Sequence, residues 1–256
     1  MTWIISIANE KGGVAKTTTT FSLCGAFVEA GYRVLAIDLD PQANLSLSMS
    51  ESTPNDPYSV IDLLINQVPF EKVIRSTNLP NLTLLPANNQ LGLAERILPS
   101  YPEYKMLLRN LLEAHKADYD FILMDCPPFL GALTTNALIA SDLLILPTQA
   151  EYYSVFALRN MMAMIRQIRS EGNPKLRYRL LLTLFDKRNR IHCSLADHLR
   201  TTFSNGVFES VIEIDTKLRE SPIAGQPIIY HAPKSRSALQ YRFLAQEIIQ
   251  YVEEKN

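Results

Sequence analysis

The residues best suited to chemistry lie near the amino terminus, in the segment Glu10-Lys11-Gly12-Gly13-Val14-Ala15-Lys16-Thr17-Thr18. An apolar run predicts a strand over residues 3–8, and an apolar helical pattern predicts a helix over residues 17–30. A turn that leads from a strand into a helix can surround phosphate groups with backbone N–H groups at the positive helix end. In such a loop Lys16 would reach the β- and γ-phosphates, and the Thr17 hydroxyl would bind Mg²⁺.

This loop departs from the common phosphate-loop pattern G-x-x-x-x-G-K-[ST] at two glycine positions. Glu10 stands at the first position and Ala15 at the second. If the second position requires a positive φ, alanine costs about 1 kcal/mol there relative to glycine. Taken alone, the segment also fits an ordinary strand, turn and helix that carries lysines by chance, so the interpretation needs support from other residues.

Three aspartates at the ends of predicted strands supply that support. Asp38 and Asp40 end the second apolar strand and lie on the same side of it, because side chains alternate along a strand. Asp125 follows four apolar residues, which is the Walker B arrangement that holds Mg²⁺ directly or through water. Ligands of parallel sheets bind at the carboxyl ends of the strands. We therefore expect these carboxylates beside the phosphate loop.

The elements that must position these residues alternate between strand and helix patterns. Strands are expected over residues 3–8, 34–38, 82–86, 121–125, 143–147, 179–185 and, more weakly, 207–212. Helices are expected over residues 17–30, 104–115, 134–140, 155–171, 194–203 and 237–254. This alternation predicts an α/β fold with a mainly parallel twisted sheet and helices on both faces. We expect one domain over residues 1–256, with surface connections at 50–57 and 88–102.

Composition limits the class of protein further. The chain has 256 residues, of which 47% are hydrophobic and 20% charged, values typical of a globular domain with a full core. No apolar run approaches the roughly 18 residues of a membrane helix, and we see no signal peptide. The three cysteines, Cys24, Cys126 and Cys193, have no metal or disulfide spacing. A reducing cytoplasm is the expected compartment.

Charge is distributed unevenly along the chain, although the net charge is only −1. Residues 1–150 hold 9 lysines and arginines against 15 aspartates and glutamates, whereas residues 151–256 hold 16 against 11. This asymmetry favours an anionic partner for the carboxyl-terminal half. Solvated helix faces would produce the same asymmetry, so charge alone does not decide between the two.

The phosphate loop resembles the deviant Walker A motif of the ParA/MinD family, in which a second, signature lysine lies near the start of the loop. Here that lysine is Lys11. The second acidic segment and the Walker B segment resemble the same family, and the similarity continues through four later segments to cover nearly the whole chain. The matching segments are Asp38–Gln42, Asp125–Pro128, Leu130–Leu138, Pro147–Tyr153, Thr183–Arg188 and Ser235–Glu247.

This resemblance implies a Mg²⁺-dependent ATPase with slow hydrolysis that uses ATP as a timer. Two copies would close face to face around ATP, and Lys11 would reach the phosphates of the partner copy. Asp40 matches the family residue that orients the attacking water, and Asp38 would act near Mg²⁺. The implied catalytic residues are Lys11, Lys16 and Asp40, the implied metal-site residues are Thr17, Asp38 and Asp125, and the loop residues Lys11, Gly12, Gly13, Val14, Ala15, Lys16, Thr17 and Thr18 would bind ATP or ADP.

The adenine site is implied by a segment that matches the family more loosely. Family members place the base near a segment similar to Val211–Asp215, which often contains a proline and an asparagine. In this chain Glu213 and Asp215 occupy those positions. The Asp215 carboxylate could accept a hydrogen bond from adenine N6.

The resemblance also implies non-specific DNA as a partner. Arg188 and Lys217 match DNA-contacting positions of ParA proteins, and Arg190, Arg219 and Arg236 lie nearby in the sequence. Phosphate contacts need only charge. We expect an ATP-dependent homodimer associated with the nucleoid. It would position a plasmid, a chromosome locus or a protein organelle such as a carboxysome through a ParB-like or other adaptor.

Two alternatives remain within the family. A MinD-like membrane regulator of division would end in a basic amphipathic helix, whereas this chain ends Val252-Glu253-Glu254-Lys255-Asn256 and should be repelled by anionic lipid. We therefore expect no membrane partner. The nitrogenase-iron-protein branch needs several cluster-ligating cysteines, and Cys126 by itself does not supply them.

Overall fold

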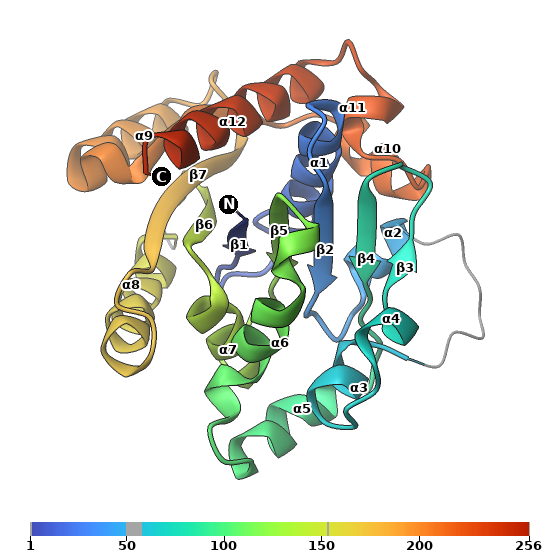
Figure 1. Cartoon of the computed structure of the whole chain (residues 1–256). Helices are drawn as coiled ribbons and strands as arrows, with labels where there is room; N and C mark the ends of the chain where they lie inside the picture. The colour runs from blue at the N-terminus through green and yellow to red at the C-terminus, as the bar shows by residue number, and fades with distance from the viewer. Residues whose placement is uncertain (1, 50–57, 153, 256) are drawn as a thin grey trace.

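The computed structural model, which describes residues 2–49, 58–152 and 154–255, is built around one twisted sheet (Figure 1). Its eight strands lie in the order β3-β4-β2-β5-β1-β6-β7-β8, and all neighbours are parallel except the β3–β4 pair at one edge. The α/β fold predicted from the sequence is confirmed. The strands are β1 Trp3–Ile7, β2 Val34–Asp38, β3 Arg75–Ser76, β4 Leu82–Leu85, β5 Phe121–Asp125, β6 Leu143–Gln149, β7 Arg177–Phe185 and β8 Val207–Glu213.

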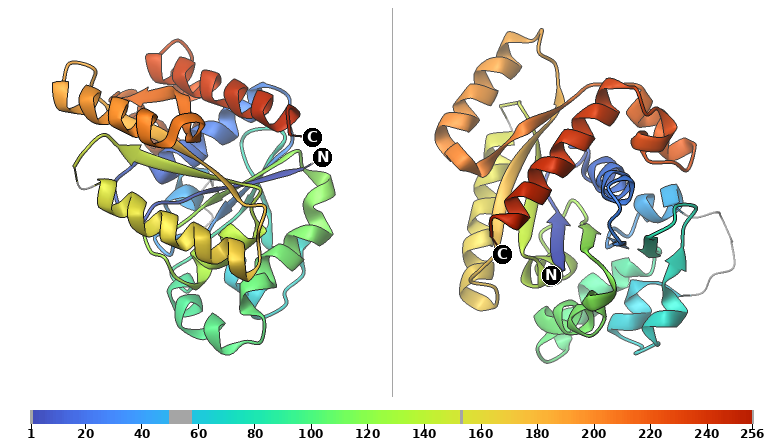
Figure 2. Two further views of the ribbon diagram at one scale, coloured as in Figure 1. Left: turned by 90° about the vertical axis from the view of Figure 1, so that its left-hand side faces the viewer. Right: turned by 45° about the horizontal axis from the view of Figure 1, so that its top comes forward.

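Helices cover both faces of the sheet, as Figure 2 shows from two further directions. One face is covered by α1 Lys16–Glu29, α2 Asn44–Met49, α10 Lys217–Ile223, α11 Ile228–His231 and α12 Arg236–Glu253. The other is covered by α3 Val60–Leu64, α4 Phe70–Val73, α5 Leu91–Ile97, α6 Leu107–His115, α7 Ala132–Ala140, α8 Ser154–Glu171 and α9 Arg190–Phe203. Short 3₁₀ turns are η1 Leu98–Ser100, η2 Tyr104–Met106, η3 Lys116–Asp118 and η4 Ser204–Gly206.

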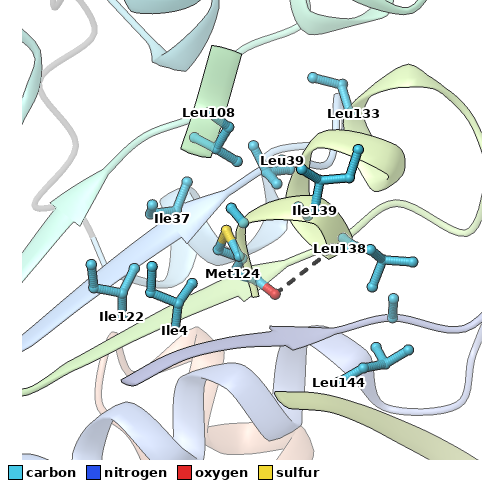
Figure 3. Close-up of a cluster of buried hydrophobic side chains, with 14 of the residues drawn as sticks. Ile4, Ile37, Leu39, Leu108, Ile122, Met124, Leu133, Leu138, Ile139 and Leu144 are labelled. Atoms are coloured by element: carbon cyan, nitrogen blue, oxygen red, sulfur yellow. Dashed lines mark hydrogen bonds between the residues drawn. The ribbon is translucent and has the colours of Figure 1, made fainter. Parts of the chain in front are cut away.

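The central strands are apolar throughout because each face of the sheet has its own core. Figure 3 shows part of one core, in which Ile4, Ile37 and Ile122 of β1, β2 and β5 lie with Leu108 of α6 and Leu138 of α7. All five side chains are buried. Neighbouring residues of the same strands turn to the opposite face and pack under α1 and α12. This two-sided burial holds the strand ends in fixed register, and those ends carry the predicted site residues.

Side-chain caps set where two later helices begin. The Asn189 side chain accepts a hydrogen bond from the N–H of Ile191 at 2.9 Å, and α9 begins at Arg190. The Ser235 hydroxyl accepts one from the N–H of Ala238 at 3.1 Å, and α12 begins at Arg236. Such caps satisfy helix N–H groups that have no partner within the helix. They also place two of the predicted DNA-contacting arginines in first helical turns.

The structure differs from the sequence-based prediction in several places. Residues 88–102 were expected to be a surface connection, but they contain α5 and η1, and Leu91, Ala94 and Leu98 are buried in the core. The short helices α2, α3, α4, α10 and α11 and the antiparallel edge strand β3 were not predicted, because segments this short carry little periodic signal. The connection predicted at residues 50–57 lies outside the described residues.

The last helix belongs to the core. Tyr241, Leu244 and Ile248 of α12 are buried with the core under α1. Within the described ranges, no helix combines the length and the apolar character that crossing a membrane requires.

Candidate nucleotide site

The loop between β1 and α1 is held open by contacts from neighbouring strands. The hydroxyl of Thr183 in β7 donates to the carbonyl of Val14 at 3.0 Å, and the side-chain amide of Gln149 in β6 donates to the carbonyl of Gly13 at 3.3 Å. A Cβ built on Gly12 or Gly13 would meet no atom within 4 Å. The first N–H groups of α1 have no acceptor within the helix. The open loop and these N–H groups fit the shape and charge of a phosphate group.

Ala15 has the positive φ that would favour glycine at this position of the phosphate-loop pattern. Its φ is 65° and its ψ is 36°, in the left-handed region, and Gly13 has a φ of 73°. The cost of about 1 kcal/mol expected for alanine at a positive φ therefore applies here. The N–H of Thr19 donates to the carbonyl of Ala15, so the residue nevertheless starts a regular helix.

We expect Ala15→Gly to bind ATP as tightly as the parent chain or more tightly, because glycine adopts the left-handed conformation without strain. The gain is limited to about 1 kcal/mol, or roughly fivefold in the dissociation constant. Titration calorimetry would measure it. Gly13→Ala is the matched control, because it introduces the same strain and should weaken binding. A large loss of affinity in Ala15→Gly would show that the alanine methyl has a packing role.

The two loop lysines lie in different environments. Lys16 is only 7% exposed, and its ammonium donates to the carbonyl of Lys11 at 3.3 Å. Burial lowers the pKa of Lys16, and the charges of Asp125 and Asp40 partly offset this effect. The side chain of Lys11 is more exposed, and its ammonium contacts Glu151 at 2.6 Å and Gln149 at 2.8 Å. Lys16 thus points its charge into the loop, whereas Lys11 is held at the rim.

The strand-end acids lie beside the loop, as predicted. Asp38 and Asp125 are paired in the register of β2 with β5, and both are fully buried. Asp125 accepts a hydrogen bond of 2.6 Å from the Thr17 hydroxyl. Asp38 accepts from the N–H and the hydroxyl of Ser46 in α2, at 2.8 and 2.7 Å. The hydroxyl and carboxylate oxygens around Thr17 are metal ligands of the kind that Mg²⁺ prefers.

Three carboxyl groups, each able to carry a negative charge, lie close together at this point of the sheet. Burial raises the pKa of Asp125 well above its usual range, and the nearby Asp38 charge raises it further. Burial also raises the pKa of Asp38, against the effect of its hydrogen bonds to Ser46. Asp40 is 8% exposed, and its carboxylate accepts from the N–H of Gln42 at 2.9 Å. A divalent cation would offset this charge. No group of three His, Cys, Asp or Glu side chains in the described ranges could hold a metal by itself, so nucleotide oxygens or water would complete its shell.

The predicted basic residues also follow carboxyl ends of strands. They lie after β7 and β8, the two strands beyond β6 in the sheet. Phe185 of β7 is paired with Glu213 of β8, so the segments that follow these two strands leave side by side. The first carries Arg188 and Arg190, and the second carries Lys217 and Arg219 in α10. Several of the charges have acidic partners: Arg188 contacts Asp186 at 3.0 Å, Lys217 contacts Glu220 at 2.7 Å, and Arg236 contacts Glu213 at 3.0 Å.

Asp215, the predicted adenine contact, follows β8 and already has two donors. Its carboxylate accepts from the Ser237 hydroxyl at 2.7 Å and from the N–H of Lys217 at 3.0 Å. Sequence reasoning did not single out the side chains of Ser46, Gln149, Glu151 and Thr183 that hold the loop and its acids. The sequence signals only that Gln149 lies shortly after the strand predicted over 143–147 and that Thr183 lies near the end of the strand predicted over 179–185.

A strand, loop and helix with a lysine and a hydroxyl at the start of the helix, beside the acid of a neighbouring strand, is typical of the P-loop nucleoside triphosphatases. The comparisons with known proteins agree. A family model described as an AAA domain matches residues 2–178. Soj, the sporulation initiation inhibitor protein of Bacillus subtilis, is 37% identical over 246 residues, which cover 96% of this chain and 97% of Soj. The chromosome partitioning protein ParA of Myxococcus xanthus is 36% identical over 247 residues, which cover 96% of this chain and 87% of ParA.

The solved structures show the same fold. A cobyrinic acid a,c-diamide synthase from Mycobacterium smegmatis with a bound ATP analog and magnesium has a TM-score of 0.88 to this chain and is 30% identical, covering 100% of this chain and 98% of that one. The chain therefore belongs to the ParA/MinD family of deviant Walker A ATPases, in the Soj-like partition branch.

Proposed function

We propose that this protein is a Mg²⁺-dependent ATPase whose ATP-bound homodimer binds DNA without sequence preference and positions cargo through an adaptor. The observation that carries the proposal is the separation of the two loop lysines. Lys16 is buried in the loop beside Asp125 and Asp40, whereas Lys11 extends to the rim, where a partner copy could approach.

ATP or ADP would lie with its phosphates in the loop formed by residues 11–18. Lys16 would neutralise the β- and γ-phosphates, and Mg²⁺ would be held by Thr17 with Asp125 and Asp38 beside it. The metal would supply charge neutralisation at the phosphates. Asp40 would orient the water that attacks the γ-phosphorus, and ADP and phosphate would leave. Asp215 would lie near adenine, after exchanging its contact with Ser237. Intrinsic hydrolysis would be slow, so that ATP acts as a timer.

Dimerisation would follow from the position of Lys11. In the monomer its ammonium is bound to Glu151 and Gln149. A partner's triphosphate offers more negative charge than one carboxylate, so the lysine would leave this pair and cross the interface. Closure of the dimer would then depend on ATP.

DNA binding is supported by the basic residues that follow β7 and β8 and by the chromosome partitioning protein ParA among the relatives. A monomer offers few such side chains. A dimer places two sets on one body, which raises the effective concentration for the second contact. The ATP-bound form would therefore associate with the nucleoid in the cytoplasm and would carry a plasmid, a chromosome locus or a protein organelle. A ParB-like adaptor would stimulate hydrolysis and so release the DNA.

We expect the double variant Arg188→Glu/Lys217→Glu to lose most DNA binding while it still dimerises with ATP. Each lost phosphate contact should reduce the slope of log K against log salt by roughly 0.9, and a dimer loses each contact twice. Gel shifts on unrelated duplexes across a salt series, with ATP and with ADP, measure both effects. The wild-type protein should bind in ATP only.

The matched control is Arg200→Glu, an exposed residue near the far end of α9. It makes one charge reversal of the same kind as each of the two reversals in the double variant, away from the carboxyl ends of β7 and β8, and should alter binding little. Equal binding with ATP and ADP would contradict the nucleotide switch. Undiminished binding by the double variant would place the DNA surface elsewhere, and ATP-dependent sedimentation with anionic liposomes in place of DNA would support the membrane alternative.

A further inference from the structure

Glu213, the last residue of β8, contacts two basic side chains near the predicted DNA-contacting residues. One oxygen of its carboxylate contacts Arg236 at 3.0 Å and Lys187 at 3.7 Å. The other accepts a hydrogen bond of 3.1 Å from the side-chain amide of Gln240. These partners come from the first turns of α12 and from the segment after β7, so one carboxylate joins three parts of the fold.

The anion is fixed in this cluster, whereas the cations are largely exposed to solvent. The side chain of Glu213 is 16% exposed, whereas those of Arg236 and Lys187 are 47% and 67% exposed. The N–H of Glu213 also donates to the side-chain oxygen of Gln240 at 3.1 Å. The side chain of Gln240 in α12 therefore bonds to both the backbone and the carboxylate of Glu213. Arg236 and Lys187 could turn from this carboxylate toward another anion without moving the backbone that carries them.

We propose that Glu213 is an internal competitor for the phosphates of DNA. The inference rests on the proposed DNA binding. A carboxylate presents the same charge and the same kind of acceptor oxygens as a phosphodiester, and its fixed position gives it a high effective concentration. Duplex DNA must displace it to recruit Arg236 and Lys187. The competition keeps the affinity of each dimer for DNA low and lets bound dimers release quickly.

A rival interpretation is that Glu213 positions Arg236 for contact with DNA. Arg236 also donates to the carbonyl of Ile214 at 2.7 Å, so its direction is set in part without the carboxylate. The two interpretations predict opposite results when the charge of Glu213 is removed. Removal of a competitor strengthens DNA binding, whereas removal of a positioning residue weakens it.

The test is Glu213→Gln, which preserves the shape of the side chain and an oxygen acceptor. DNA binding is measured by gel shift at saturating ATP, with dimer formation measured separately by light scattering. We expect an affinity gain of about three- to tenfold, the range of one or two competing surface ion pairs. The slope of log K against log salt should become steeper by roughly 0.9 for each side chain released onto a phosphate.

Glu209→Gln is the matched control, because it removes the same charge from an exposed position four residues earlier in β8. It should change affinity and slope little. In a Lys187→Gln/Arg236→Gln background the gain from Glu213→Gln should disappear. Lys187→Gln should also be made in the parent chain, where it should not disturb the fold because Lys187 is exposed. It should weaken DNA binding only slightly, because Glu213 holds that lysine away from DNA.

Each of the following results would overturn the inference while leaving the DNA function intact: weaker binding by Glu213→Gln, unchanged binding, an equal gain in Glu209→Gln, or a gain that persists without Lys187 and Arg236. A large loss from Lys187→Gln in the parent chain would do the same. If the wild-type dimer binds no duplex at any salt concentration, the proposed DNA function itself fails and removes this inference with it.

Discussion

Replacing Lys11 with alanine should give a protein that binds ATP but no longer dimerises. The ammonium of Lys11 lies at the rim of the phosphate loop, where its partners are Glu151 and Gln149, and it is Lys16 that lies within the loop. Loss of one member of a buried charge pair at an interface removes about 2 kcal/mol or more, so the dimer dissociation constant should rise roughly thirtyfold or more. Light scattering with ATP and Mg²⁺ measures the mass directly.

Two further variants make this experiment decisive. Lys16→Ala should lose ATP affinity itself, because it removes the charge that would face the β- and γ-phosphates. Glu151→Gln should still dimerise, because it frees Lys11 from its 2.6 Å ion pair. The ATP concentration that this variant needs for dimerisation should be no higher than that of the parent chain. If Lys11→Ala dimerises as well as the wild type, the role of Lys11 across the interface is wrong.

Replacing Asp40 with alanine should trap the protein as an ATP-bound dimer that hardly hydrolyses ATP. Asp40 lies two residues beyond the end of β2, close enough for its charge to act on Lys16. The Thr17 hydroxyl of the expected metal site donates to Asp125, whereas the Asp40 carboxylate accepts from the N–H of Gln42, so the two carboxylates have separate partners. Removal of a residue that orients or accepts a proton from the attacking water typically lowers turnover by about 100-fold or more. Phosphate release and dimer mass should be followed in the same sample.

Asp40→Asn separates this chemical role from the local structure. The amide side chain would retain an oxygen acceptor for the N–H of Gln42, so the turn after β2 should persist and the variant should dimerise with ATP. Normal phosphate release from Asp40→Ala would move the role to another side chain. Asp38 is the next candidate, because its carboxylate lies on the same strand end and contacts Ser46 of α2.

Local sequence determined the parts of the site that lie within single elements. Apolar runs predicted the central strands, and the acids that end two of them had to lie at the carboxyl edge of a parallel sheet. The strand, loop and helix around Lys16 and Thr17 were predicted for the same reason. The order of motifs identified the family, and the charge asymmetry drew attention to the carboxyl-terminal half.

The tertiary structure decided the contacts between residues that are far apart in the chain. Lys11 meets Glu151, Thr183 meets Val14, and Glu213 meets Arg236 because the strand order and register place their elements side by side. No local pattern encodes such pairings, since they depend on which strands become neighbours. The helix α5 was missed for a related reason: its seven residues show little periodicity, and the helix is stabilised by the core beneath it, which forms only in the tertiary structure.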